Sequence, residues 1–179
     1  MTVGEITPGY EVWRPNREKA ETNATKALVT LLLLASGVLT TIITIGGFTV
    51  LQGGAFMGII CIIFALIYVL FAVLAARWSR GVLPVAASAA VFMAIFAGVA
   101  VPSWFGRDKA GFEETLLPAP LLGLLTAALL ILQLVVVVVA VIAFNQDWHV
   151  EEERPIGSGT EYGAGSEHQP PSSAPPQPA

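Results

Sequence analysis

Long apolar stretches without charges dominate the pattern of hydrophobic and polar positions along this chain. Residues 121–144 contain no charged residue, and their only polar side chains are Thr126 and Gln133. As a helix this stretch would be about 36 Å long at ~1.5 Å per residue, whereas the hydrocarbon layer of a bilayer is ~30 Å thick. Three comparable stretches precede it, so the sequence predicts transmembrane helices at about 27–50, 55–76, 82–101 and 121–144.

The predicted fold is an all-α integral membrane protein, with four transmembrane helices bundled over residues 27–144. Residues 1–26 are polar, and the first fifteen show no regular pattern. Asn16 is expected to cap a charged helical lead-in that runs straight into the first span. Pro102 is expected to end the third span, and the connection 103–120 is expected to lie along the membrane surface.

Residues 145–179 form a third region that turns polar directly after the last span. An acidic juxtamembrane segment comes first, in which Trp148 is expected to anchor the chain at the membrane interface. From Pro155 onward the tail is rich in Pro, Gly and Ser and has almost no aliphatic side chains. It cannot bury enough apolar surface to offset its ordering entropy, so it is predicted to be disordered.

The distribution of basic residues predicts the orientation of the spans. Seven of the nine Lys and Arg residues fall in segments on one side of the predicted membrane. They are Arg14, Arg17, Lys19, Lys26, Arg77, Arg80 and Arg154. Only Arg107 and Lys109 fall on the other side. Cytoplasmic segments carry the excess of positive charge, so both termini are predicted to be cytoplasmic.

Composition supports a membrane protein and excludes several classes of site. The chain is 55% hydrophobic and only 12% charged, whereas soluble proteins average about a quarter charged residues. A single cysteine, Cys61, excludes an internal disulfide or a Cys-x-x-Cys site, and its apolar flanks indicate a structural role. No basic cluster of the kind that neutralises phosphates is present, so a nucleic-acid partner is not expected.

Small residues recur at helical spacing in the first three spans and are candidates for close helix packing. The candidates are Gly37, Thr40, Thr44 and Gly47 in the first span, Gly54 and Gly58 in the second, and Ala90 and Ala94 in the third. One interpretation is packing within a single bundle. The alternative is a dimer face, or a groove for a lipid or quinone, and the sequence does not separate the two.

Gln133 is the most polar side chain deep in any predicted span. On a helix it shares a face with Gly123, Thr126, Val137 and Ala140. A hydrogen bond to another helix is the ordinary role for such a residue. A contact to a ligand or a pore is the alternative.

Catalytic, cofactor and metal sites are not predicted. The spans contain no Asp, Glu, Lys, Arg or His, which ion-coupled transporters and haem-binding bundles place inside the membrane. The sequence has no Gly-x-Ser-x-Gly, His-Glu-x-x-His or phosphate-loop motif. His149 with Glu152 and Glu153 has helical spacing for a metal, but a solvated juxtamembrane segment is the expected interpretation.

These observations favour a non-catalytic accessory subunit or scaffold of a larger complex in a bacterial inner membrane. Its expected partners are the lipid bilayer and either another membrane protein or further copies of itself. The alternative is an oligomeric channel or facilitator for a small neutral solute, with Thr40, Thr44 and Gln133 as the candidates for a polar stripe. An enzyme that acts on lipid would have to use His149 and its acidic neighbours, and has the least support.

Overall fold

The computed structural model describes residues 9–51, 54–107 and 115–156. The elements follow in the order β1 (Tyr10–Trp13), α1 (Pro15–Glu18), α2 (Ala20–Gly46), the 3-10 helix η1 (Phe48–Val50), α3 (Gly54–Ala76), α4 (Val82–Gly106), α5 (Ala119–Phe144) and β2 (Glu152–Pro155). The predicted tail at 157–179, most of the 52–54 turn and part of the 103–120 connection lie outside the described residues.

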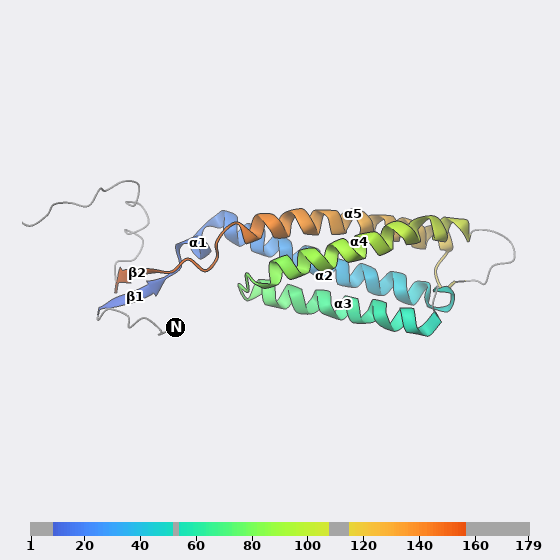
Figure 1. Cartoon of the computed structure of the whole chain (residues 1–179), viewed down its shortest axis with the longest axis horizontal. Coiled ribbons are helices and arrows are strands. Elements are labelled where there is room, and N and C mark those ends of the chain that lie inside the picture. The colour runs from blue at the N-terminus through green and yellow to red at the C-terminus, as the bar shows by residue number, and fades with distance from the viewer. Residues whose placement is uncertain (1–8, 52–53, 108–114, 157–179) are drawn as a thin grey trace, which may run out of the picture.

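The helices α2 to α5 lie side by side in an elongated bundle (Figure 1). Within the described residues, these four helices are long and apolar enough to cross a membrane, which confirms the prediction of a mostly helical chain with four such helices. α4 packs chiefly on α5, and α2 packs on both α3 and α5. α3 and α4 follow one another in the chain but make few contacts.

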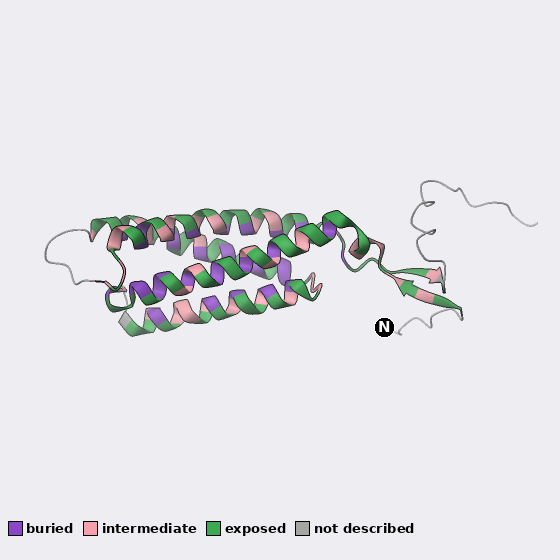
Figure 2. Ribbon diagram, turned by 180° about the vertical axis from the view of Figure 1, so that it is seen from behind, coloured by how far each residue is buried: buried purple, intermediate pink, exposed green. Residues whose placement is uncertain are grey.

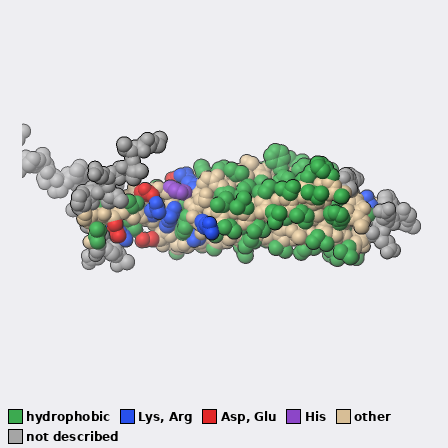
Figure 3. All heavy atoms as spheres, turned by 90° about the horizontal axis from the view of Figure 1, so that it is seen from below, with side chains coloured by type: hydrophobic (Ala, Val, Ile, Leu, Met, Phe, Trp, Pro, Cys, Tyr) green, Lys and Arg blue, Asp and Glu red, His purple; other side chains and the backbone are tan. Residues whose placement is uncertain are grey.

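The outward faces of the bundle are apolar, and its inward faces combine large apolar, small and polar residues. Figure 2 shows the buried positions facing inward along each long helix. Leu66 on α3 and Ile131 on α5 are each 64% exposed, and Figure 3 shows hydrophobic side chains covering most of the bundle surface. A soluble bundle places charged residues on this face, so the pattern fits helices surrounded by lipid.

Two helix ends differ from the sequence-based expectation. Pro15, not Asn16, opens the lead-in at the first position of α1, where its fixed φ suits a helix start. The lead-in is interrupted at Lys19, which is extended (ψ 131°) between α1 and α2. From Ala20 to Lys26 it runs straight into the first span, as expected. Pro102 does not end its helix, because α4 continues to Gly106. This last turn is packed on its neighbours, with the Trp104 ring against Gly47 and the Phe105 ring against Gly123.

The chain also contains a short sheet that the sequence did not predict. β1 pairs antiparallel with β2, with Tyr10 opposite Pro155 and Trp13 opposite Glu152. The expectation of an irregular N-terminus was therefore wrong for Tyr10–Trp13. Glu152 and Glu153 are exposed, as expected for a solvated segment, although they lie in a strand. The pairing brings the two ends of the described chain together beyond one end of the bundle, at the left of Figure 1.

Candidate functional site

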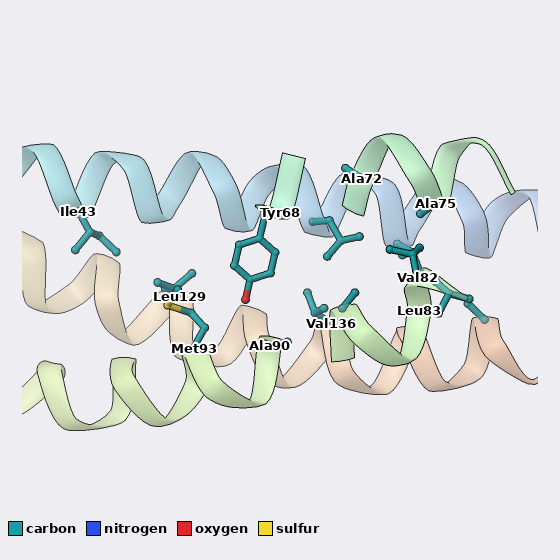
Figure 4. Packing of buried hydrophobic residues seen from close by; sticks show 14 of the residues in the cluster. Ile43, Tyr68, Ala72, Ala75, Val82, Leu83, Ala90, Met93, Leu129 and Val136 are labelled. Carbon is teal, nitrogen blue, oxygen red and sulfur yellow. The ribbon is translucent and has the colours of Figure 1, made fainter. Parts of the chain in front are cut away.

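A hydrogen-bonded network of polar side chains lies in the middle of the bundle and joins three helices. The Tyr68 hydroxyl of α3 donates to Oε1 of Gln133 on α5 at 2.7 Å, and Nε2 of Gln133 donates to Oγ of Ser36 on α2 at 3.1 Å. Ser36 Oγ in turn donates to the Leu32 carbonyl of its own helix at 2.9 Å. Figure 4 shows Tyr68 reaching from α3 into the interior. All three side chains are fully buried.

This network gives Gln133 a structural partner on each side of its amide. Its carbonyl oxygen accepts a hydrogen bond and its NH₂ group donates one, so both ends of the amide are engaged within the protein. In a low-dielectric interior, an unpaired amide would cost several kcal/mol (~2–7). The predicted hydrogen bond to another helix is therefore present in the structure, and Tyr68 and Ser36 are the partners that sequence reasoning missed.

The other polar residues predicted at the interface between helices continue the seam between α2 and α5. Thr44 donates to the Thr40 carbonyl at 2.7 Å, and Thr126 donates to the Leu122 carbonyl at 2.7 Å. Both hydroxyls are thus bonded to their own helices, as is common for Thr in membrane helices. The Thr40 hydroxyl is buried without a hydrogen-bond partner.

The predicted small-residue positions are used in two different ways. At Gly37 the backbones of α2 and α3 approach closely, since a Cβ there would lie 3.1 Å from the Ala65 carbonyl oxygen of α3. Gly47 and Gly58 instead lie against aromatic rings. A Cβ on Gly47 would be 2.3 Å from the Trp104 ring, and one on Gly58 would be 2.4 Å from the Phe48 ring.

The remaining predicted positions are less uniform. Ala90 is fully buried, whereas Ala94 is only partly buried. The buried residues of α4 are Val82, Leu83, Ala86, Ala90, Met93, Ala97 and Trp104. Gly54 begins α3, and its surroundings fall outside the described residues. On α5, Gly123, Thr126, Gln133 and Ala140 share the buried face, as predicted, and Val137 lies at its edge.

A groove opens between α3 and α4 near the end of the bundle that lies away from the termini. Its volume is about 380 Å³, within the ~300–1,000 Å³ range of small-molecule pockets. Apolar side chains line it, including Phe64 of α3, Phe96 of α4 and Leu51, which follows η1. Cys61 also lines the groove, and Arg107 is its one charged lining residue among those described. Arg107 donates from Nη2 to the Val50 carbonyl at 3.0 Å.

A second polar cluster lies at the opposite end, where α1, the segment between α5 and β2, and the turn between α3 and α4 meet. We call β1, β2 and the Trp78–Trp148 pair the terminal clasp. Trp148 is fully buried, and its ring meets Trp78 edge to face with centroids 5.3 Å apart. The expectation that Trp148 anchors the chain at the membrane interface was therefore wrong, because the protein itself covers this ring.

Basic residues hold the terminal clasp to the bundle. Arg17 donates to the Trp148 carbonyl at 3.1 Å, and the ammonium group of Lys26 lies 4.0 Å from the centroid of the Trp78 ring. Burial lowers the pKa of the Arg17 guanidinium, with a further lowering by Arg14 that Glu151 opposes.

Ion pairs add to these contacts. Arg14 pairs with Glu151, Arg80 pairs with Asp147 at 2.6 Å, and Arg154 pairs with Glu11 at 2.7 Å. Each joins parts of the chain that are far apart in sequence. Exposed pairs contribute only ~0–1 kcal/mol each, so they orient the clasp more than they stabilise it.

His149, Glu152 and Glu153, the weak metal-site candidate from the sequence, do not have the helical arrangement that this site would need. Glu152 and Glu153 lie in β2, where successive side chains point to opposite faces, so helical spacing from His149 does not apply. In residues 9–51, 54–107 and 115–156 no group of three or more His, Cys, Asp or Glu residues is placed to hold a metal ion.

Comparisons with protein-family models, with curated proteins and with solved structures find no match to this chain. The candidate sites therefore stand on geometry alone. They are the buried Ser36–Gln133–Tyr68 network, the groove between α3 and α4, and the terminal clasp. Ser36 and Tyr68 are polar groups within apolar spans, and that signal was visible in the sequence.

Proposed function

We propose that this protein is a non-catalytic accessory subunit or scaffold of a larger membrane complex. The observation that carries the proposal is how the polar interior is used. The side chains of Gln133, Tyr68 and Ser36 hydrogen-bond within the protein, and these bonds join α2, α3 and α5. A transporter or membrane enzyme needs polar groups that face its substrate, and this network is closed on itself.

The same geometry disfavours the alternative of a channel. Gln133 was the strongest candidate for a pore-lining residue, yet its side chain is 0% exposed and engaged at both ends of its amide. Thr40 and Thr44 also face the interior of the bundle.

We place the protein in a bacterial inner membrane with both termini in the cytoplasm. The pairing of β1 with β2 supports the location of both ends on one side of the membrane. The basic residues near that end support a cytoplasmic side. In Figure 3, Lys and Arg side chains gather where the apolar surface meets the polar end.

The outer face of α3 is the surface that we assign to a partner. Of the four long helices, α3 has the smallest buried share, because it packs mainly on α2. Its outward row is large and apolar and includes Phe56, Ile63 and Leu66. A partner helix that packed there would bury this row by van der Waals contact, which drives association in membranes.

Site-specific photocrosslinking in intact membranes tests the proposal. A photoreactive residue at Leu66 on α3 is compared with one at Ile131 on α5, since each side chain is 64% exposed. We expect one discrete protein adduct of constant mass at Leu66 and none at Ile131. Extraction in a mild detergent should then give a complex larger than the monomer. Lipid adducts only at both positions, together with a monomer after mild extraction, would overturn the proposal.

A further inference from the structure

We propose that the groove between α3 and α4 binds an acyl chain of an acidic phospholipid, with the phosphate of its headgroup at Arg107. This site goes beyond the scaffold role and rests only on the membrane placement proposed above. The inference comes from the shape of the groove, from the sorting of its lining by polarity, and from the charge at one end.

The shape of the groove follows from how the helices pair. α3 packs on α2 and α4 packs on α5, so two consecutive helices are left with a slot between them. The slot spans Met57 to Phe64 along α3 and Met93 to Arg107 along α4. At ~1.5 Å per residue these segments are about 10 Å and about 21 Å long. The slot therefore runs along the helices, in the direction of a lipid chain.

The lining is sorted by polarity along this direction. Phe64 and Met93 lie at the deep end, and the lining there is apolar. Arg107 directly follows the last residue of α4 and lies at the outer end of the slot, beside Ser103. An apolar slot that ends at a cation is complementary to an amphiphile with an apolar chain and an anionic head.

Arg107 is also held in position to meet such a head. Its Nη2 donates to the Val50 carbonyl at 3.0 Å, which ties the end of α4 to η1 at the mouth of the slot. A guanidinium has five N–H donors in a planar fork that suits phosphate oxygens.

Two close contacts lie beside the slot. The Trp104 ring forms one wall and packs against Gly47, where a Cβ would come within 2.3 Å of it. The Phe48 ring lies against Gly58 in the same way. Gly47 thus lets the Trp104 ring of α4 approach the end of α2, and Gly58 lets the Phe48 ring of η1 approach α3.

Native mass spectrometry of the full-length protein in a neutral detergent tests the proposal. The two probes are dioleoyl-phosphatidylglycerol and dioleoyl-phosphatidylcholine, which share acyl chains and differ in headgroup charge. We expect one phosphatidylglycerol molecule to be retained more tightly than phosphatidylcholine. Arg107→Gln should weaken phosphatidylglycerol binding by about tenfold, because charge-assisted hydrogen bonds are lost, and Arg107→Lys should restore part of it.

Matched variants locate the site. Arg77→Gln removes one positive charge at the opposite end of the bundle and should leave lipid binding within about twofold. Ala100→Phe places a ring in the slot and should weaken binding of both lipids while Arg107 is intact. Cys61, the single thiol of the chain, lines the slot. Its modification by N-ethylmaleimide should slow when phosphatidylglycerol is added to the wild-type protein.

Several outcomes would overturn the inference. The first is equal retention of the two lipids, and the second is an equal loss of phosphatidylglycerol binding in Arg107→Gln and Arg77→Gln. The third is protection of Cys61 from modification in a lipid-free dimer, which would show that a second copy covers the slot. If Arg107→Gln does not fold, Ala100→Phe and the Cys61 measurement decide the question alone. Detergent-free recovery of the protein would refute the membrane placement instead, so the two failures are distinguishable.

Discussion

The Tyr68 hydroxyl and the Gln133 side-chain oxygen lie 2.7 Å apart, although 65 residues separate them in the chain. This bond joins α3 to α5. The phenol has only one further polar neighbour among the described residues, the Ala89 carbonyl at 3.5 Å. Gln133 is therefore the partner on which the buried hydroxyl depends.

Gln133→Leu is expected to destabilise the bundle by about 1 kcal/mol, because hydrogen bonds between membrane helices contribute ~0.6–1.7 kcal/mol. Thermal unfolding of the purified protein in detergent measures the change. Tyr68→Phe should cost a similar amount, and the double variant should cost less than the two single changes together, because both remove the same bond. Strict additivity of the two changes would show that the bond does not contribute to stability.

Gly47→Ala is expected to destabilise the protein by about 1–3 kcal/mol, the usual cost of overpacking a core. The new methyl group would come within 2.3 Å of the Trp104 ring and displace it. Tryptophan fluorescence and the thermal unfolding midpoint provide the readout. Gly98→Ala on α4 is the matched control, since nothing lies within 4 Å of a Cβ there, and it should be neutral or stabilising. An equal loss in both variants would argue against the Trp104 contact.

The pairing of β1 with β2 can be tested by disulfide formation in a Cys61→Ser background. Val12 lies opposite Glu153, so Val12→Cys with Glu153→Cys should form a disulfide under mild oxidation. Tyr10→Cys with Glu152→Cys is the control, because these residues are three positions out of register, about 10 Å along the strand. The migration of the protein on a non-reducing gel reports the bond. Equal crosslinking of both pairs would contradict the register.

Reporter fusions test the orientation. A reporter that is active only in the periplasm should be inactive when fused after Ala179 and active when inserted between α4 and α5. These outcomes follow from the orientation that we propose on the positive-inside rule, with the clasp end in the cytoplasm. Enzymatic activity of the fusions in whole cells, normalised to protein level, is the measurement. Strong activity of the C-terminal fusion would reverse the assigned orientation.

The helices could be predicted from the sequence because the bilayer imposes a strong local constraint. A run of ~20 apolar residues must be helical to satisfy its own backbone in lipid. The prediction of an interhelical role for Gln133 has the same basis, since a buried amide in lipid needs a partner. The identity of that partner depends on how helices rotate against each other, and Tyr68 and Ser36 could not be assigned from spacing alone.

The parts that were missed depend on contacts between distant segments. β1 and β2 are four residues each, too short for a clear alternating pattern. They pair because the bundle brings their ends together. Trp148 has the composition of an interfacial anchor, but Trp78 lies where it covers this ring. From the sequence, Arg107 was expected to be one of the charged residues of the 103–120 connection. In the structure it lies at the mouth of the groove between α3 and α4, which depends on how these helices pack.

The terminal clasp can form only late in the synthesis of the chain. Glu11 and Arg154, which pair across it, are 143 residues apart, so β1 emerges from the ribosome long before its partner strand exists. At ~5–20 residues per second the delay is roughly 7–30 s, during which all four helices must enter the bilayer. A nascent chain that stalls before Glu152 keeps an open edge on β1 that chaperones and proteases can recognise. Closure of the clasp thus marks a chain that has been translated through β2.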